Sequence, residues 1–163
     1  MTTTTYGTKY NNNLNTTEIA AAIRAEIKAA QKSGALPKGV KISVTTDYFS
    51  GGSSIDLTIK AFPGQRIHTP AGVVQSASFD FIHPSLRAPR YEAPVQAVLD
   101  TLEALHKAYN YNGSDISSDY FHVRFYGSVT VGWELARDDR KAVEATITPE
   151  QKAVLKAEFD KDW

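Results

Sequence analysis

Apolar residues recur with a helical period soon after the start of the chain. Three isoleucines stand four residues apart, at Ile19, Ile23 and Ile27. This spacing places them on one face of a helix. Asn15 is a favourable N-cap, and Glu18 three residues later has the spacing of a capping box. Gly34 followed by Pro37 is a strong stop signal. The pattern therefore predicts a helix between Asn15 and Gly34.

Strict alternation replaces the helical period in the next segment. The apolar positions of its two arms are Val40, Ile42 and Val44, then Ile55, Leu57, Ile59 and Ala61. A period of two on each arm predicts two strands with one buried face and one solvated face. The segment 47–54 between them is rich in glycine and serine, so we expect a β-hairpin with a long connecting loop.

Two more helices are predicted in the second half of the chain. The first begins near Pro94 and ends near Ala108, with an apolar stripe at Val95, Val98, Leu99, Leu102 and Leu105. The last begins at Thr148-Pro149-Glu150-Gln151, which offers an N-cap, a proline at N1 and a glutamine at N3. Its apolar residues are Val154, Leu155 and Phe159.

A third alternating block has all of its apolar residues at odd positions: Phe121, Val123, Phe125, Val129, Val131 and Trp133. Two interpretations fit. One is a single bent strand with a kink at Gly127. The other is a hairpin with the three-residue loop 126–128, which keeps every apolar side chain on one face. The charged residues 137–141 that follow predict an exposed turn.

These elements predict an α+β fold, with an antiparallel sheet of about four strands and two to three helices over one face. Residues 1–14 are low in complexity and are expected to form a flexible or loose edge segment. Residues 15–163 are expected to form one domain, because 163 residues suit a single core. Prolines and glycines interrupt 62–93, which we treat as an insertion. Within it, residues 73–82 favour a strand.

Composition excludes several classes of protein. Eighteen basic and eighteen acidic residues cancel, so no strongly basic footprint for nucleic acid is present. The chain has no cysteine, which excludes disulfides and thiolate chemistry. The four histidines form no metal-binding pair in sequence, and we expect neither a metal nor a cofactor. No apolar run approaches the ~20 residues of a membrane span, and no signal peptide is evident, so we expect a cytoplasmic protein without a membrane partner.

The tripeptide Asp-Tyr-Phe occurs twice beside small polar residues, at 47–49 and 119–121. Loops at strand ends often carry binding residues. The first loop offers Asp47, Tyr48, Ser50 and Ser53 as candidate contact residues. The even positions of the third block add an aromatic and cationic row: Tyr120, His122, Arg124 and Tyr126. Such a row suits a partner surface or stacked bases, and the alternative is a solvated face whose rings cover the sheet.

Three motifs together suggest a family. They are the capped helix leading into the strand Lys41–Val44, the hairpin Tyr48–Leu57, and the stretch Ala108–Asp115 that precedes Asp119–Phe121 and Arg124–Tyr126. Over residues 15–133 the chain resembles a large polyvalent protein-associated domain, a group of modules in proteins of phages and conjugative elements. The resemblance implies a mobile-element origin, a role around incoming DNA and a blunting of host defences.

We therefore expect a non-enzymatic protein that binds and inhibits a host defence component, of the anti-CRISPR or antirestriction type, with a host protein as partner. The alternative is a nucleic-acid-binding accessory module that uses the same row. That module would add the cations Arg24, Lys28, Lys32 and Lys41. A third hypothesis is an enzyme with loop carboxylates and His122 in a cleft. The exposed hairpin edge also favours a homodimer.

Overall fold

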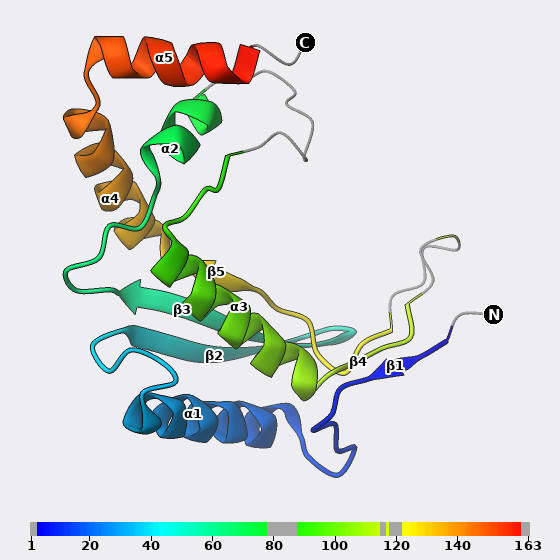
Figure 1. The fold of residues 1–163 in the computed structure, drawn as a ribbon. Coiled ribbons are helices and arrows are strands. Elements are labelled where there is room, and N and C mark those ends of the chain that lie inside the picture. Colours follow the sequence, from blue (N-terminus) through cyan, green and yellow to red (C-terminus); the bar gives the residue numbers. More distant parts are fainter. Residues whose placement is uncertain (1–2, 78–87, 115–116, 118–121, 161–163) are drawn as a thin grey trace. The chain divides into compact units, whose positions relative to one another are not determined.

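The computed structural model describes residues 3–77, 88–114, 117 and 122–160 (Figure 1). Contacts within the chain define two compact units, and each is built from two stretches of sequence. The first unit comprises Met1–Ala61 and Val98–Val131, and the second comprises Phe62–Ala97 and Gly132–Trp163. The first stretch of the second unit nearly coincides with the segment 62–93 that the sequence marks as an insertion.

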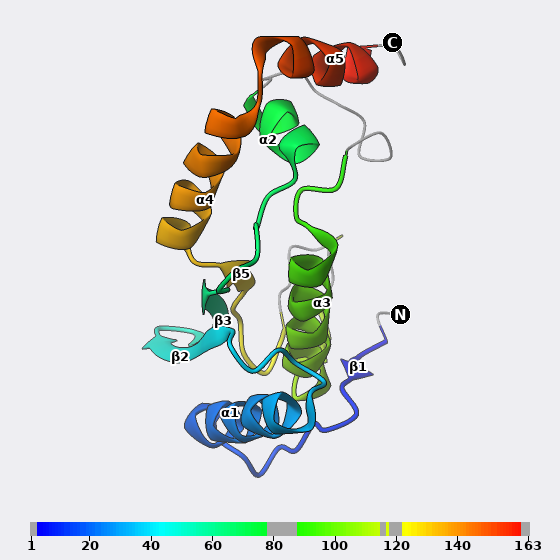
Figure 2. The ribbon, with the colours of Figure 1, turned by 60° about the vertical axis from the view of Figure 1, so that its left-hand side comes forward.

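The first unit contains a sheet, a small strand pair and two helices. Its helices are α1 (Thr16–Ser33) and the part of α3 (Ala93–Ala108) from Val98 onward. Its strands are β1 (Thr5–Tyr6), β2 (Lys41–Phe49), β3 (Gly52–Ala61), β4 (Tyr111–Asn112) and β5 (Val129–Val131). Figures 1 and 2 show α1 and α3 on the same side of β2, β3 and β5. The α+β class predicted from the sequence is thus confirmed, with helices over one face of the sheet.

Helix α1 begins and ends where the sequence predicts. The Asn15 side chain accepts a hydrogen bond from the Glu18 backbone N–H at 2.9 Å, and the Glu18 carboxylate accepts one from the Asn15 N–H at 2.8 Å. This capping box satisfies two amide donors at the helix start. Gly34 ends the helix with a φ of 86°, a left-handed conformation that glycine adopts without steric cost. Ile19, Ile23 and Ile27 are buried.

Strand β3 lies at the centre of the main sheet, between β2 and β5. It pairs antiparallel with β2 and parallel with β5, so the third strand is not antiparallel as expected. The alternation is as predicted: Ile55, Leu57 and Ile59 are fully buried on the helix-covered face. Val44 of β2 is buried on the same face, opposite Leu57. These apolar side chains form the core of the first unit against α1 and α3.

The segment around Gly127 is a single extended stretch, and the hairpin alternative is wrong. Tyr126 pairs with Ser54, and Val129 pairs with Leu57, with the same sequence offset before and after Gly127. Gly127 has a φ of 131°, and an added Cβ atom would lie only 1.9 Å from the Ile55 carbonyl oxygen. The close approach of two backbones therefore requires glycine at this position.

Residues 5–10 pack against the end of α3, in the manner of an edge segment. Thr5 and Tyr6 pair antiparallel with Asn112 and Tyr111. The N–H groups of Gly7 and Lys9 extend this contact by donating to the Asn110 and Ala108 carbonyls, each at 2.8 Å. The segment is thus held by backbone hydrogen bonds on both sides of Gly7.

The second unit contains α2 (Pro70–Ala77), α4 (Trp133–Thr146), α5 (Pro149–Asp160) and the first residues of α3. Thr148 and Gln151 form the predicted capping box at the start of α5, with bonds of 3.0 and 3.2 Å. The strand expected at 73–82 is wrong for residues 73–77, which are helical, and 78–82 lie outside the described residues. Two adjacent valines suit one turn of a helix as well as a strand, and Pro70 starts the helix.

Helix α4 corrects two expectations. Residues 137–141 lie within it, so the predicted turn is wrong; charged residues are compatible with an exposed helix face. Trp133 begins the helix and does not extend the strand. Its side chain is 67% exposed, and the Arg137 guanidinium lies 4.7 Å from its ring centroid. The odd-position pattern ends at Val131 because Gly132 then turns the chain into the helix.

Asp139 joins α4 to the segment before α2. Its carboxylate accepts hydrogen bonds from the backbone N–H groups of Ile67 and His68, both at 2.9 Å, and lies 2.8 Å from the His68 Nδ1 atom. The His68 ring is buried and lies against Tyr91, with centroids 5.5 Å apart. One carboxylate thus holds two parts of the unit that are about 70 residues apart in sequence.

We predict that Asp139→Ala lowers the free energy of unfolding by about 3 kcal/mol, because two buried backbone donors lose their acceptor. The matched control is Asp138→Ala, since Asp138 is exposed and its ion pair is with the neighbouring Arg137; this change should cost less than about 1 kcal/mol. Urea unfolding followed by circular dichroism measures both. Equal losses in the two variants would show that the Asp139 bonds do not stabilise the unit.

We also predict that Gly127→Ala destabilises the protein by more than about 3 kcal/mol, because the new methyl group clashes with the Ile55 carbonyl and the backbone is strained. Gly34→Ala is the control: Gly34 also has a positive φ, but nothing lies within 4 Å of its added Cβ. The Gly34→Ala change should lower the free energy of unfolding by only about 1–2 kcal/mol. Thermal unfolding measures the stability of both variants. A Gly127→Ala protein as stable as Gly34→Ala would contradict the close approach of the Gly127 and Ile55 backbones.

Candidate functional site

The sheet of the first unit has a second face that the described helices of this unit do not cover (Figure 2). By strand parity this open face carries the odd positions of β2, the even positions of β3 and the even positions 126–130. Its exposed residues include Thr45, Asp47, Phe49, Tyr126 and Thr130. Polar side chains predominate, so the two large rings stand out.

Phe49 and Tyr126 form an exposed aromatic pair at the tip of the β2–β3 hairpin. Their ring centroids are 5.9 Å apart, and the side chains are 47% and 39% exposed. Both rings pack over Gly52: a Cβ atom added there would lie 3.2 Å from the Tyr126 ring and 3.4 Å from the Phe49 ring. Backbone hydrogen bonds of 2.8 and 2.9 Å fix Tyr126 to Ser53 and Ile55. The pair is therefore held on paired backbone.

Two carboxylates lie on the same open face. Asp56 Oδ1 accepts hydrogen bonds from the backbone N–H and the hydroxyl of Ser128, at 2.9 and 3.0 Å. Asp47 is exposed, and its Oδ1 accepts a bond from the Tyr48 N–H at 2.9 Å. The basic residues of this face, Lys41 and Lys60, lie at the opposite end of the two strands. The hairpin tip is thus aromatic and acidic.

The other candidate residues of the hairpin are placed differently. Tyr48 lies on the helix side, where its hydroxyl is 2.6 Å from the Thr17 hydroxyl, although the ring is 60% exposed. Ser53 is buried and hydrogen-bonded to Thr16 at 2.6 Å, so it offers no surface to a partner. The strands pair up to Phe49 and Gly52, so the long loop expected at 47–54 is wrong, and Ser50 is exposed in a two-residue turn. Of the loop candidates, Asp47 shares the open face with Tyr126.

The predicted row of Tyr120, His122, Arg124 and Tyr126 is not a single strand face. Tyr120 lies outside the described residues. The Asn110 side chain accepts from the N–H groups of Arg124 and Phe125, and donates to the Phe125 carbonyl at 2.9 Å. The Arg124 guanidinium donates to the Leu14 carbonyl at 2.6 Å. Arg124 is therefore used to hold the chain, and it separates His122 from Tyr126.

His122 belongs to a second aromatic cluster, which we call the tyrosine cluster: Tyr6, Tyr10, Tyr111 and His122. The three tyrosine rings lie 5.1–5.8 Å apart, and the His122 ring lies 4.9 Å from the Tyr111 ring. The Tyr111 hydroxyl and His122 Nε2 are 2.8 Å apart. Tyr6 is 60% exposed. Strand pairing between β1 and β4 brings these rings together.

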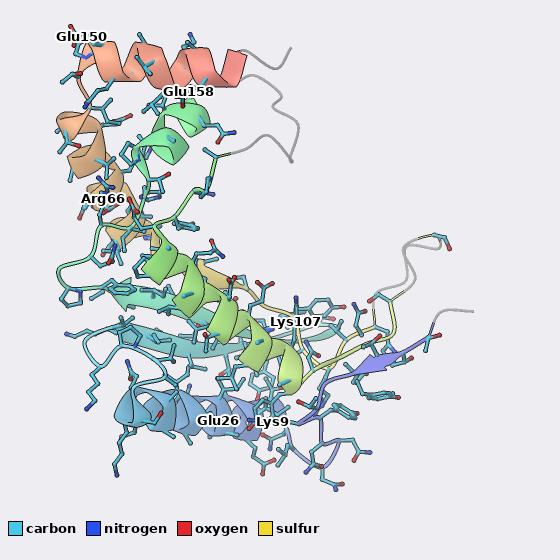
Figure 3. All side chains as sticks on the ribbon, in the orientation of Figure 1. Lys9, Glu26, Arg66, Lys107, Glu150 and Glu158 are labelled. Carbon is cyan, nitrogen blue, oxygen red and sulfur yellow. The ribbon has the colours of Figure 1, made fainter. Side chains whose placement is uncertain are left out.

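A groove of about 720 Å³ lies beside the tyrosine cluster. Tyr6 and Tyr111 line one part of it, Val123 and Val129 contribute apolar surface, and His106 lies in the wall formed by α3. Glu103 and Lys107, 3.5 Å apart, also line it; Lys107 lies near the C-terminal end of α3 (Figure 3). We call this hollow the α3 groove.

His106 is the buried polar residue of this groove. Its Nε2 atom lies 2.9 Å from the Ile55 carbonyl oxygen, which can only accept, so Nε2 carries the proton. The ring stands edge-on to Phe125, with centroids 4.8 Å apart. Burial lowers the pKa of His106, against the opposing effects of the Ile55 carbonyl, Asp56 and Glu103; Lys107 lowers it further. At neutral pH the ring is therefore uncharged and Nδ1 keeps its lone pair.

A separate polar cluster fixes the start of the chain to α1. Lys9 and Tyr109 both hydrogen-bond to the Glu26 carboxylate. Figure 3 shows Lys9 beside Glu26. Burial alone would raise the pKa of Glu26, but the bonds from Lys9 and Tyr109 outweigh it and lower the pKa. Burial, together with the bond to Glu26, raises the pKa of Tyr109 to about 12. This cluster orders the segment that carries Tyr6 and Tyr10.

The sequence indicates Asp47 and Tyr126 as candidate contact residues of the open face, but it does not single out Phe49, His106 or the tyrosines of the cluster. Phe49 shares the odd parity of Asp47 on β2, so extending the alternation by two residues would have placed it on the open face. His106 is one of the four histidines, which form no metal-binding pair in the sequence. The tyrosine cluster depends on pairing between β1 and β4, which are two residues each, and strands so short leave no period in the sequence.

Comparison with protein-family models, with curated proteins and with solved structures gave no match. Among the described residues, no group of three or more histidine, aspartate or glutamate side chains is arranged to hold a metal ion. In the same part of the chain, no helix is both long and apolar enough to cross a bilayer.

We predict that stability depends on the titration of His106. Because its pKa in the folded protein is below the ordinary value of 6.5, the unfolded chain binds the proton more readily. The contribution of His106 to the free energy of unfolding is complete above pH 6.5, and it is lost as the pH falls through the pKa of His106 in the folded protein. His106→Gln keeps a donor for Ile55 without a titrating ring. Its unfolding free energy should therefore change less between pH 7 and pH 5 than that of the wild type.

Chemical unfolding at several pH values between 7 and 5 measures this difference. The wild type, measured over the same pH range, is the reference. Identical pH dependence in His106→Gln and in the wild type would show that His106 is not coupled to folding.

Proposed function

We propose that this chain is a non-enzymatic protein-binding module and that its contact surface is the tip of the open sheet face, centred on Phe49 and Tyr126. The observation that carries the proposal is the exposed aromatic pair over Gly52. Large exposed rings are enriched at protein interfaces, where a few such residues supply most of the binding energy. Because paired backbone already holds both rings, little conformational freedom is lost when they bind.

The charge around the pair indicates the chemistry of the partner. Asp47 and Asp56 lie on the same face, with Asp56 fixed by Ser128. A matching protein surface has an apolar centre and basic residues at its rim. Nucleic acid is disfavoured at this tip, because its phosphates would be repelled by the two carboxylates. The nucleic-acid alternative from the sequence is further weakened because Arg24, one of its cations, donates to the Val44 carbonyl at 2.8 Å.

We further propose that the partner is a host defence component, in the cytoplasm of the host cell, and that binding inhibits it. This finer statement rests on the resemblance of residues 15–133 to domains of phage and conjugative-element proteins. An inhibitor of the anti-CRISPR or antirestriction type acts by occupying a surface of its target. Such a role requires a rigid contact face and no catalytic group, which suits the aromatic pair.

The test is a double variant, Phe49→Ser with Tyr126→Ser, compared with Thr130→Ala on the same open face. We expect the double variant to remain folded, because both rings are exposed, and to bind the partner at least about tenfold more weakly, as for loss of a hot spot. Thr130→Ala should bind like the wild type. Tagged proteins retained from a nuclease-treated host lysate identify the partner, and calorimetry with the purified partner gives the affinities.

A functional arm tests the finer proposal. The wild type, expressed in bacteria that carry a restriction or CRISPR system, should restore phage plaque formation, and the double variant should not. Equal binding and equal plaque formation by the folded double variant would reject this surface. Retention that disappears with nuclease would instead favour the nucleic-acid-binding alternative.

A further inference from the structure

We infer that the α3 groove is a binding site for a nucleobase. This site is separate from the aromatic pair, and the inference does not depend on the function proposed for that pair. The groove is of a size that holds small ligands. It combines an aromatic wall, an apolar floor and a buried hydrogen-bond acceptor, the three features by which proteins recognise a flat heteroaromatic ring.

The aromatic wall comes from Tyr6 and Tyr111. Tyr6 is 60% exposed, while its contacts with Tyr10 and Tyr111 and the pairing of β1 with β4 hold it in place. A tyrosine face of this kind stacks on any base, because every base has a π-face. Val123 and Val129 also line the groove and add apolar surface. A flat ring matches aromatic and apolar lining of this kind better than a tetrahedral anion does.

His106 supplies the polar recognition. With Nε2 bonded to Ile55, the remaining ring nitrogen, Nδ1, is an acceptor in a side chain that is more than nine-tenths buried. Among the described residues the only fully buried side-chain nitrogen or oxygen without a partner is Gln75 Nε2. His106 Nδ1, which has no hydrogen-bond partner among these residues, is therefore not fully buried and reaches solvent. The space that it can reach is the groove, because His106 lines the groove. Nδ1 is placed to accept a hydrogen bond from an N–H group on a base edge.

The charges along the groove favour a base over a bare phosphate as the recognised group. Glu103 and Lys107 pair with one another, and both side chains are more than half exposed. They present no net positive charge to an anion, so any phosphate of the ligand extends toward solvent. The recognised chemistry is therefore the base itself, in a free nucleotide or in a single strand.

In the experiment the full chain is titrated with AMP, CMP, GMP and UMP, and separately with a single-stranded DNA of ten nucleotides of mixed sequence. Chemical shifts of the backbone amides are followed by NMR. Ribose 5-phosphate is the ligand control that lacks a base. We expect saturable shifts at Tyr6, His106 and Tyr111 with at least one base-containing probe and none with ribose 5-phosphate. Binding of a mononucleotide assigns the site to free nucleotides, and binding of the oligonucleotide alone assigns it to single strands.

Matched variants test the residues. Tyr6→Ala should raise the Kd about tenfold through loss of one stacking surface. Tyr48→Ala, equally exposed but outside the groove, should leave the Kd unchanged. His106→Gln retains the donor to Ile55 and should also weaken binding about tenfold. The inference is overturned if no probe binds, if ribose 5-phosphate binds as well as the nucleotides, or if Tyr6→Ala and Tyr48→Ala bind alike.

Discussion

The carbonyl group of Ile55 is the point on which the first unit depends. Gly127 passes so close to it that no side chain fits between the two backbones, and His106 donates a hydrogen bond to the same oxygen. The central strand is thereby joined to β5 on one side and to α3 above it. Any group that separated Gly127 from Ile55 would disturb the sheet and the helix at once. The arrangement of the core is thus set by backbone contact as much as by apolar burial.

Both candidate surfaces follow from this constraint. The parallel pairing before and after Gly127 fixes the parity of this segment. Phe125 therefore points into the core, and Tyr126 points out beside Phe49. On the helix side, the bond to Ile55 leaves Nδ1 of His106 available to the groove. The proposed contact surface and the proposed ligand groove therefore lie in one small unit, because the sheet has two faces with different neighbours.

The sequence predicted the regular parts of this fold well, for physical reasons that can be named. The capping boxes at Asn15 and Thr148 and the alternation from Ile55 to Ile59 are local signals, and the structure follows them. Contacts distant in sequence were not predictable in this way. Nothing near Asp139 indicates that its carboxylate binds the amides of Ile67 and His68, and the charged residues around it were interpreted as a turn. Parity correctly places Tyr126 on an open face, but it cannot show that Arg124 bonds to Leu14 and interrupts the row.

The discontinuity of the two units affects the order in which the chain can fold during synthesis. The first 97 residues supply one part of each unit and complete neither. Val73 and Val74 of α2, and the amides of Ile67 and His68, are made before α4 and its Asp139 exist. Until then the two amides lack their carboxylate acceptor, and closing a loop of about 70 residues has an entropic cost that short-range contacts avoid. Until residues 132–163 are made, the segment 62–97 therefore lacks the part of the chain that completes its unit, and such partly built units are prone to aggregation.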